Sequence, residues 1–205
     1  MAQITHGVWS ILSYPLFYSL LQSIMGARRS RKKFVIEQVK PFKGMNVLDV
    51  GCGPAEILNY LPDVNYWGFD VSENYIVHAR AKFKARGNFH CKVLQETDIE
   101  NLPKFDIVLA LGLLHHLDEN EAQNIMQLAS KALKFGGKLL TIDPCFEPSQ
   151  NLIAKFLIDN DRGQNVRDKN GYKNIALTVF NDVLVDVRHQ NWIPYTNCFM
   201  ECKKS

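Results

Sequence analysis

Acidic and glycine residues follow short apolar runs at places where they could bind a ligand. Asp49 lies in the run "VLDV", which leads into a turn with Gly51, Cys52 and Gly53. Asp70 ends the run "YWGFD", about 20 residues after that turn, the separation at which an acid accepts from the two hydroxyls of a ribose. The glycines let a ligand approach the backbone closely because they carry no side chain. The spacing predicts a site for a nucleoside.

The residue after the glycine turn argues against a pyrophosphate. The dinucleotide pattern G-x-G-x-x-G would place a third glycine where the chain has Glu56. Two more acids, Asp98 and Asp143, follow later apolar runs. Pyrophosphate prefers helix N-terminal amides and positive charge, whereas several carboxylates suit a ligand with a cationic part. We therefore expect a nucleoside without phosphate, and an NAD-dependent oxidoreductase is the less favoured alternative.

Strand-like runs alternate with helical patterns from residue 45 onward, which predicts a mostly parallel sheet with right-handed crossovers. The tail differs, because "DVLVDVRHQ" and "YTNCFMECK" follow each other closely and predict an antiparallel pair. We expect an α/β three-layer sandwich whose seven-stranded, doubly wound, Rossmann-like sheet has one antiparallel edge strand. Such a sheet brings the acids together, because ligands bind at the carboxyl ends of its strands.

Caps and glycines predict where the helices begin and end. A helix is expected to begin at Pro54, and another after Ser72, which is a good N-cap residue. A long helix is expected from Asp118 to Lys134, ended by the glycines at 136 and 137.

Four motifs between residues 45 and 146 resemble those of the class I S-adenosylmethionine-dependent methyltransferases, in the order and spacing of that family. "VLDVGCGPAEIL" is similar to the first motif, "YWGFDVSENYI" to the second, "FDIVLALGLLHHL" to the fourth-strand motif and "LKFGGKLLTID" to the fifth-strand motif. The resemblance implies that S-adenosyl-L-methionine is the cofactor and S-adenosyl-L-homocysteine the product.

The resemblance also implies a role for each matching residue. The turn from Gly51 to Gly53 would line the methionine part of the cofactor, Asp49 would reach its ammonium group, and Asp70 would hold the ribose hydroxyls. Simple capping of a strand end or loop is the alternative for the three acids Asp49, Asp70 and Asp98. The remaining contacts would be Val71 and Ile99 on the adenine ring, Asp98 on its amino group, and the carbonyls of Ala110 and Leu111 near the ammonium.

Methyl transfer needs alignment of the acceptor with the methyl group and sulfur, and a hydroxyl or ammonium acceptor also needs a base. His115 and His116 follow the fourth strand and Asp143 ends the fifth, so these three are the catalytic candidates, with structural packing as the alternative for the histidines. The "DPCF" sequence lies on the fifth strand, unlike the D-P-P-Y signature of enzymes that methylate base or amide nitrogens. This favours small-molecule, sugar or lipid-linked acceptors, most of all at oxygen, and no nucleic acid.

Two further segments are expected to border the acceptor. The stretch 156–174 is interpreted either as a solvated loop or as a lid, and residues 1–40 as a helical lid or cap before the methyltransferase domain of residues 41–205. Residues 1–27 hold no Asp, Glu, Lys or Arg, but serines and a proline interrupt them too often for the ~20 apolar residues of a membrane span. A surface helix with Arg28 to Lys33 near lipid head groups is the second interpretation. The substrate-binding candidates in the first stretch are Arg162, Gln164, Arg167 and Tyr172.

The composition sets the remaining limits. The net charge of +3 over 205 residues is too small to argue for nucleic acid. Five scattered cysteines without a C-x-x-C pair argue against a disulfide framework or a metal site, so a reducing, cytoplasmic location is expected. The oligomeric state is open. A binding module that keeps the cofactor pocket without turnover is the alternative to an enzyme.

Overall fold

The structure is a computed structural model, and it describes residues 27–159, 163–190 and 195–205. Its centre is an eight-stranded sheet with the order β3-β2-β1-β4-β5-β8-β7, and the short β6 pairs with β5 outside this order. The strands are β1 Asn46–Val50, β2 Asn65–Asp70, β3 Asn88–Cys91, β4 Phe105–Leu111, β5 Leu133–Phe146, β6 Arg167–Asp168, β7 Asp182–Gln190 and β8 Tyr195–Lys203.

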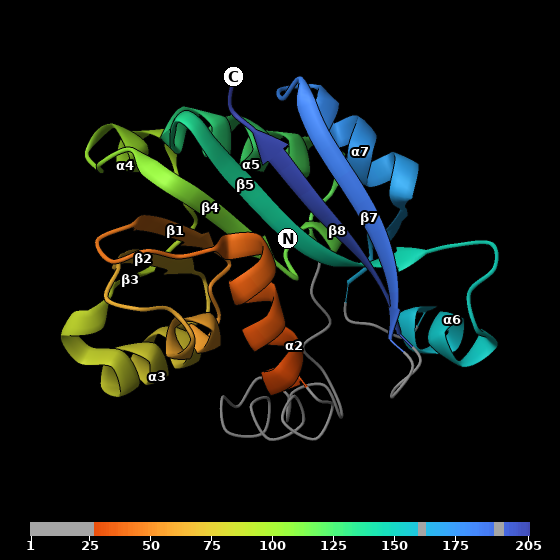
Figure 1. Cartoon of the computed structure of the whole chain (residues 1–205), viewed down its shortest axis with the longest axis horizontal. Helices are drawn as coiled ribbons and strands as arrows, with labels where there is room; N and C mark the ends of the chain where they lie inside the picture. The colour runs from red at the N-terminus through yellow and green to blue at the C-terminus, as the bar shows by residue number, and fades with distance from the viewer. Residues whose placement is uncertain (1–26, 160–162, 191–194) are drawn as a thin grey trace.

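Helices cover both faces of the sheet and complete the three layers (Figure 1). One face packs against α2, η2, η3 and α3, and the other against α4, α5 and α7. The helices are α2 Ala27–Phe34, η2 Val35–Val39, η3 Glu56–Asn59, α3 Glu73–Phe83, η4 Lys84–Arg86, α4 Glu96–Glu100, η5 Leu114–His116, α5 Glu119–Ala132, α6 Leu152–Asp159 and α7 Lys169–Leu177.

The predicted fold class is confirmed, and the reversed strand lies one place farther in than expected. β8 runs antiparallel to both β5 and β7 and lies between them, so the edge strand β7 runs in the same direction as β5. β8 buries Cys198, Met200 and Cys202 in the core. β7 carries Asp182, Asp186 and Arg188, and charged side chains suit an edge strand because they oppose pairing with another chain.

Two predicted helix boundaries differ in the structure. The helix expected from Pro54 is a single 3-10 turn, because Ala55 before it has a left-handed φ of 55° and breaks the helical path. The helix expected to reach Lys134 ends at Ala132, since Leu133 is buried and already pairs with Phe105 of β4. The predicted N-cap is confirmed, because Ser72 accepts from the backbone of Tyr75. Asp118, where the long helix was expected to begin, is the N-cap residue of α5 and accepts from the backbone of Glu121.

The first part of the chain that the structure describes packs on the sheet. Phe34, Val35 and Val39 are buried in the core, and Lys138 of β5 donates to the carbonyl of Gln38. Residues 1–26 of the predicted lid lie outside the described residues. Within the three described ranges, none of the helices combines the length and hydropathy that a membrane crossing requires.

Candidate active site

The carboxyl ends of four parallel strands bring the predicted acids to one rim of the sheet. β1 lies between β2 and β4, with Asp49 opposite Gly68 on one side and Leu109 on the other. β5 lies beside β4, with Ile142 opposite Leu111. Asp70 ends β2. The rim therefore runs from Asp70 past Asp49 to Asp143.

The glycine turn after β1 is tied directly to Asp70. Gly51 and Gly53 have φ values of 71° and 53°, and a side chain at Gly51 would lie 2.9 Å from Leu113 Cδ1. The Gly53 N–H donates to Asp70 Oδ2 at 2.8 Å, and the Ser72 N–H donates to Oδ1 at 2.8 Å. Each carboxylate oxygen keeps acceptor capacity for a ligand hydroxyl. Burial raises the pKa of Asp70, and these backbone bonds oppose that shift.

Asp49 is a buried acid without a cationic neighbour among the described residues. It is 3% exposed and accepts from the Tyr66 hydroxyl at 2.6 Å. Burial raises the pKa of Asp49 to about 7, the Tyr66 hydrogen bond lowers it, and the charge of Asp70 raises it further. The ion pairs found within the described ranges do not include Asp49 or Asp70. A ligand cation here would favour the charged forms of both acids.

The other predicted cofactor residues differ in how much of their surface is exposed. Val71 is 49% exposed beside Asp70, which leaves an apolar surface at the rim. Cys52 and Ala110 are buried, and Leu111 is half-buried. The last, Ile99, is 3% exposed, so it offers little side-chain surface to a ring.

Asp98 lies in the first turn of α4, where it has protein partners. It forms an ion pair with Lys92 and accepts from the Gln95 N–H at 3.0 Å, as the N3 residue of a capping box. The structure therefore gives Asp98 the helix-capping contacts that were the alternative to adenine binding.

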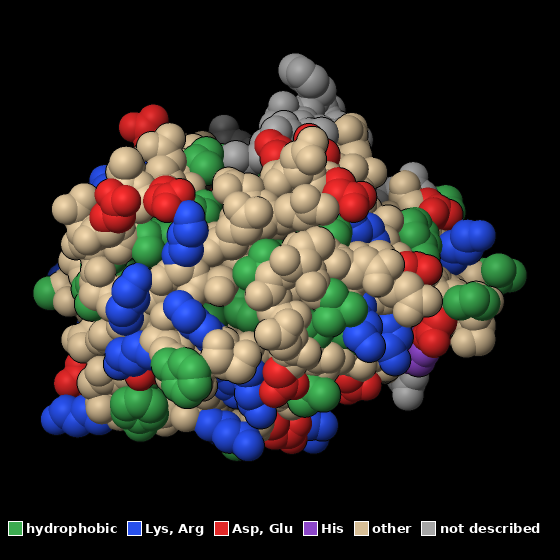
Figure 2. Space-filling view, turned by 90° about the horizontal axis from the view of Figure 1, so that it is seen from above, with side chains coloured by type: hydrophobic (Ala, Val, Ile, Leu, Met, Phe, Trp, Pro, Cys, Tyr) green, Lys and Arg blue, Asp and Glu red, His purple; other side chains and the backbone are tan. Residues whose placement is uncertain are grey.

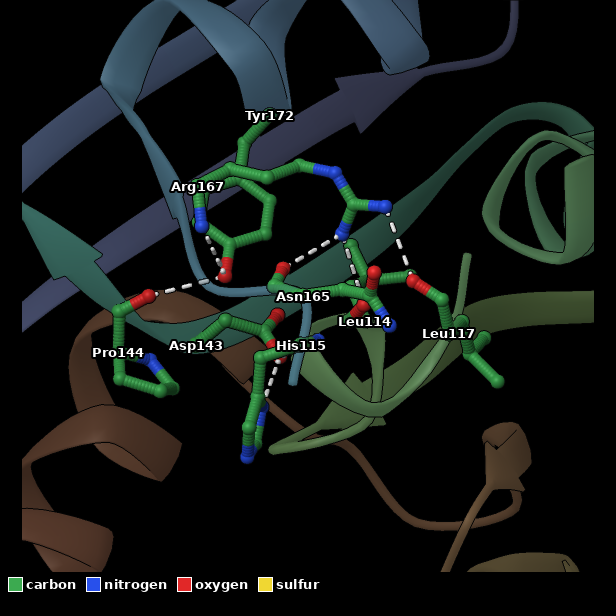
Figure 3. A network of polar contacts seen from close by, with 8 residues as sticks. All are labelled: Leu114, His115, Leu117, Asp143, Pro144, Asn165, Arg167 and Tyr172. Carbon is green, nitrogen blue, oxygen red and sulfur yellow. Dashed lines mark hydrogen bonds and ion pairs between the residues drawn. The ribbon is translucent and has the colours of Figure 1, made fainter. Parts of the chain in front are cut away.

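His115 and Asp143 form a buried pair at the end of β5. His115 Nδ1 lies 2.9 Å from Asp143 Oδ1, and the His115 backbone N–H donates to the same oxygen at 3.2 Å. The two residues are 5% and 1% exposed. Figure 3 shows the His115 ring pointing away from β5, with Nε2 at its far end. Asp143 fixes the ring orientation through Nδ1, and the ring of His116 lies 4.0 Å away.

The segment 163–168 folds over η5 and holds His115 in place. The Asn165 N–H donates to the His115 carbonyl at 2.9 Å, and a side chain at Gly163 would lie 2.0 Å from His115 Cδ2. Arg167 donates to the carbonyls of Leu114 and Leu117, both at 2.9 Å (Figure 3).

The structure gives two of the predicted substrate-binding residues other partners. The Arg167 guanidinium donates to the carbonyls of Leu114 and Leu117, in and just after η5. Tyr172 is 1% exposed and donates to the Pro144 carbonyl at 2.9 Å. Both were predicted to contact substrate under the interpretation of 156–174 as a lid, and most of this stretch is α6, β6 and α7. Gln164 is exposed. Arg162 lies outside the described residues.

The roles of Gly163 and Asn165 were missed from the sequence. Both residues contact His115, about 50 positions earlier in the chain. Asn165 does so through its backbone N–H, and Gly163 can approach the His115 ring because it has no side chain. In the described ranges, no set of three or more His, Cys, Asp or Glu side chains is arranged to hold a metal ion.

Comparison with known proteins identifies the domain. A family model described as a methyltransferase domain matches residues 48–139. The tRNA U34 carboxymethyltransferase of Shewanella frigidimarina (strain NCIMB 400) is 30% identical over 130 residues, covering 60% of this chain and 38% of that protein. The mitochondrial ubiquinone biosynthesis O-methyltransferase of Dictyostelium discoideum is 35% identical over 123 residues, covering 52% and 38%. The chain thus spans well under two thirds of these relatives' length.

Solved structures share the fold at low sequence identity. The S-adenosylmethionine-dependent methyltransferase SibL in its apo form has a TM-score of 0.66 and 16% identity, covering 91% of this chain and 58% of that chain. The phosphoethanolamine N-methyltransferase 2 of Haemonchus contortus, in complex with S-adenosyl-L-methionine, has a TM-score of 0.64 and 16% identity, covering 85% and 52%. The matched family model and the sequence relatives show a methyltransferase domain of the class I S-adenosylmethionine-dependent family in this chain, and these solved structures share its fold.

Proposed function

We propose that the chain transfers a methyl group from S-adenosyl-L-methionine to an oxygen of a small-molecule, sugar or lipid-linked acceptor. The observation that carries the proposal is the pair of rim carboxylates, Asp49 and Asp70. Asp49 has a raised pKa and a single hydroxyl partner, so a cationic ligand would stabilise its charged form.

The residues at the rim fit the cofactor. Asp49 would bind the ammonium of its methionine part, beside the open backbone of Gly51 and Gly53. Asp70 would accept from the ribose hydroxyls, and the exposed side chain of Val71 would pack on the adenine ring. Bound S-adenosyl-L-methionine supplies an electrophilic methyl group on a sulfonium sulfur.

His115 would act as the base for the acceptor. Asp143 holds Nδ1 of the imidazole, so the ring presents Nε2 on its other side to take a proton. The Asp143 carboxylate would stabilise the imidazolium that forms, as a hydrogen-bonded acid does for a histidine base. A base at this place suits a hydroxyl acceptor. Among the relatives, the Dictyostelium protein is named as an O-methyltransferase.

Location and acceptor class are part of the proposal. All five cysteines are free thiols, which supports a reducing, cytoplasmic location. The relatives named for tRNA and for phosphoethanolamine act on other acceptor classes, so both classes belong in the test of acceptors.

Titration calorimetry with S-adenosylhomocysteine tests the cofactor site. The protein should bind this product and not NAD, and Asp70→Ala should weaken the affinity roughly 100-fold, because two hydrogen bonds to a charged group are lost. Asp106→Ala is the matched control: Asp106 also accepts a backbone N–H, from Asn46, but it lies at the opposite rim. Undiminished binding by Asp70→Ala, or tight binding of NAD instead, would overturn the proposal.

Transfer of labelled methyl then identifies the acceptor. The label should appear on oxygen in hydroxylated small molecules, sugars or lipid-linked extracts. Label found only on nitrogen or only in tRNA would contradict the acceptor class. Cofactor binding without transfer to any of these would assign the chain as a binding module.

A further inference from the structure

We propose that α6 and α2 together form a docking surface for an anionic lipid bilayer, placed at the same rim as the candidate active site. Two independent features of the described chain carry this inference, an outward apolar face on α6 and a run of cations on α2. Neither feature has a part in the methyl transfer proposed above.

The helix α6 turns an apolar face outward. It packs on β5 and β8 through Ala154 and Ile158, which are 2% and 1% exposed. On the opposite side of the helix, Leu152, Ile153 and Phe156 are 82%, 58% and 65% exposed. A helix on the surface of a protein in water normally has polar residues on that side, and one that is apolar all round is normally covered. Single exposed apolar residues are ordinary, but three that share one short helix indicate a contact surface.

The helix α2 carries cations with few acidic partners. Its eight residues, "ARRSRKKF", include five Lys or Arg side chains and no acid. Arg28, Arg29, Lys32 and Lys33 are exposed. Among the described residues, the ion pair found for this run is the one between Lys33 and Glu37, at 3.9 Å. The helix therefore presents positive charge that a partner can neutralise.

The lysines of the opposite rim differ, because they are already partnered. Figure 2 shows the molecule from that side, where Lys and Arg side chains lie among Asp and Glu side chains. Lys131 pairs with Glu96 at 2.5 Å and Lys134 with Asp106 at 2.6 Å. Lys104 and Lys204 donate to carbonyls at the end of α5. These contacts bind the lysine ammonium groups to the protein itself, so these groups are less available to a partner than the cations of α2.

The packing of α2 carries its cations to the rim of the active site. The Gln38 carbonyl accepts from Lys138, which lies near the start of the paired part of β5. The Phe34 ring lies 6.4 Å from the ring of Phe199, and Phe199 pairs with Ile142 near the end of β5. The helix thus runs against the direction of β5, and Arg28 lies farther on toward the carboxyl ends of the strands. α6 follows the end of β5 directly, and Figure 1 shows both helices reaching the same end of the molecule.

An anionic bilayer is the partner that fits both features. Cations on α2 would lie at the lipid phosphates, since polybasic segments are attracted to anionic head groups. Leu152, Ile153 and Phe156 would enter the boundary between head groups and acyl chains, as the apolar face of an interfacial helix does. The acceptor side of the active site would then face the membrane surface.

Vesicle co-sedimentation of the full chain, without cofactor, tests the surface. The protein should sediment with vesicles of phosphatidylcholine mixed with phosphatidylglycerol and stay in solution with phosphatidylcholine alone. Arg28→Glu with Arg29→Glu should weaken binding roughly tenfold or more, and Leu152→Ser with Phe156→Ser should do the same. Phe42→Ser with Lys43→Glu is the matched control, because it removes an exposed Phe and an exposed Lys at the opposite rim, and it should bind like the unchanged protein.

Several results would overturn the proposal. Absence of sedimentation with the mixed vesicles would do so, as would full binding by either of the two double variants. Equal loss in the control at residues 42 and 43 would show that binding has no defined face. Thermal unfolding of each variant establishes that it is folded. Because no cofactor is present, failure here leaves the proposed methyl transfer untouched.

Discussion

The two halves of the rim are held together in different ways. At β1 and β2, backbone N–H groups and one tyrosine hydroxyl satisfy Asp49 and Asp70, and all of these partners lie between Gly53 and Ser72. At β4 and β5, His115 and Asp143 are 28 residues apart, and a third segment, 163–168, closes over them through Asn165 and Arg167. By the roles that we propose for them, we call these the cofactor half and the acceptor half.

The difference indicates how the two halves can vary. The cofactor half depends on a local turn with fixed backbone geometry, so few of its residues can change without moving the carboxylates. The acceptor half depends on side chains from distant segments that meet in space. The geometry of the acceptor half therefore depends on the 163–168 segment, whereas that of the cofactor half does not.

The largest expected effect separates chemistry from cofactor binding. His115→Gln should lower the rate of methyl transfer roughly 100- to 10,000-fold, because a general base contributes that much. The affinity for S-adenosylhomocysteine should stay the same, since His115 belongs to the acceptor half. Single-turnover rates and calorimetry measure the two quantities. His116→Gln is the matched control, and equal rates for the two variants would remove His115 from the chemistry.

Loss of Arg167 should weaken the acceptor half alone. Arg167→Met leaves the carbonyls of Leu114 and Leu117 without their charged donor, which should lower the free energy of unfolding by about 2 kcal/mol. Methyl transfer should fall while cofactor affinity is kept. Arg86→Met is the matched control at the amino ends of β2 and β3, away from the rim, where Arg86 donates to the Leu58 and Leu61 carbonyls. Equal loss of transfer in both variants would contradict the division into halves.

Protonation of Asp49 should make the cofactor half sensitive to pH. The pKa of Asp49 in the folded protein is about 7, above the ordinary value of 3.8. Between these two pH values, the folded protein therefore keeps a proton on Asp49 that the unfolded chain has already released. The free protein should therefore lose stability as pH rises from about 4 to 7. Binding of a cationic ligand near pH 7 should release roughly half a proton, because about half of the Asp49 groups are protonated there. Calorimetry in two buffers of different ionisation enthalpy measures this release. Asp49→Asn should abolish it, and a release that persists in this variant would assign the proton to another group.

The smallest expected effect concerns the turn itself. Ala55 has a φ of 55°, which an L side chain rarely adopts. Ala55→Gly should raise the free energy of unfolding by about 1 kcal/mol, since the left-handed strain of a non-glycine residue is removed. Chemical denaturation measures it, with Ala129→Gly in α5 as a control that should be destabilised instead. A loss of stability in Ala55→Gly would show that burial of the Ala55 methyl group outweighs the strain of the turn.

The sequence was sufficient to bring Asp49, Gly53 and Asp70 together, because the signals around β1 and β2 are local. Strand-like runs predicted β1 and β2, and the acids and glycines at their ends predicted a site that the structure brings together at Asp49, Gly53 and Asp70. The position of the reversed strand was missed by one place, because two neighbouring strands of similar pattern do not show which one joins β5.

The acceptor half could not be predicted to the same depth. The donors Arg167 and Tyr172 resembled substrate-binding groups in the sequence, but they donate to carbonyls of Leu114, Leu117 and Pro144. Which carbonyl a guanidinium reaches depends on how β5, η5 and α7 meet. The pairing of Asp143 with His115 could have been predicted, because His115 follows β4 and Asp143 lies near the end of the neighbouring β5. The fit of Gly163 against the His115 ring could not.

The insertion of β8 between β5 and β7 has a consequence for synthesis of the chain. β7 leaves the ribosome before β8, yet β7 has no pairing partner in the sheet until β8 has joined β5. Until then β5 presents an open edge with unpaired N–H and C=O groups, which can template contacts with other chains. A nascent chain that stalls before residue 195 therefore keeps this open edge of β5.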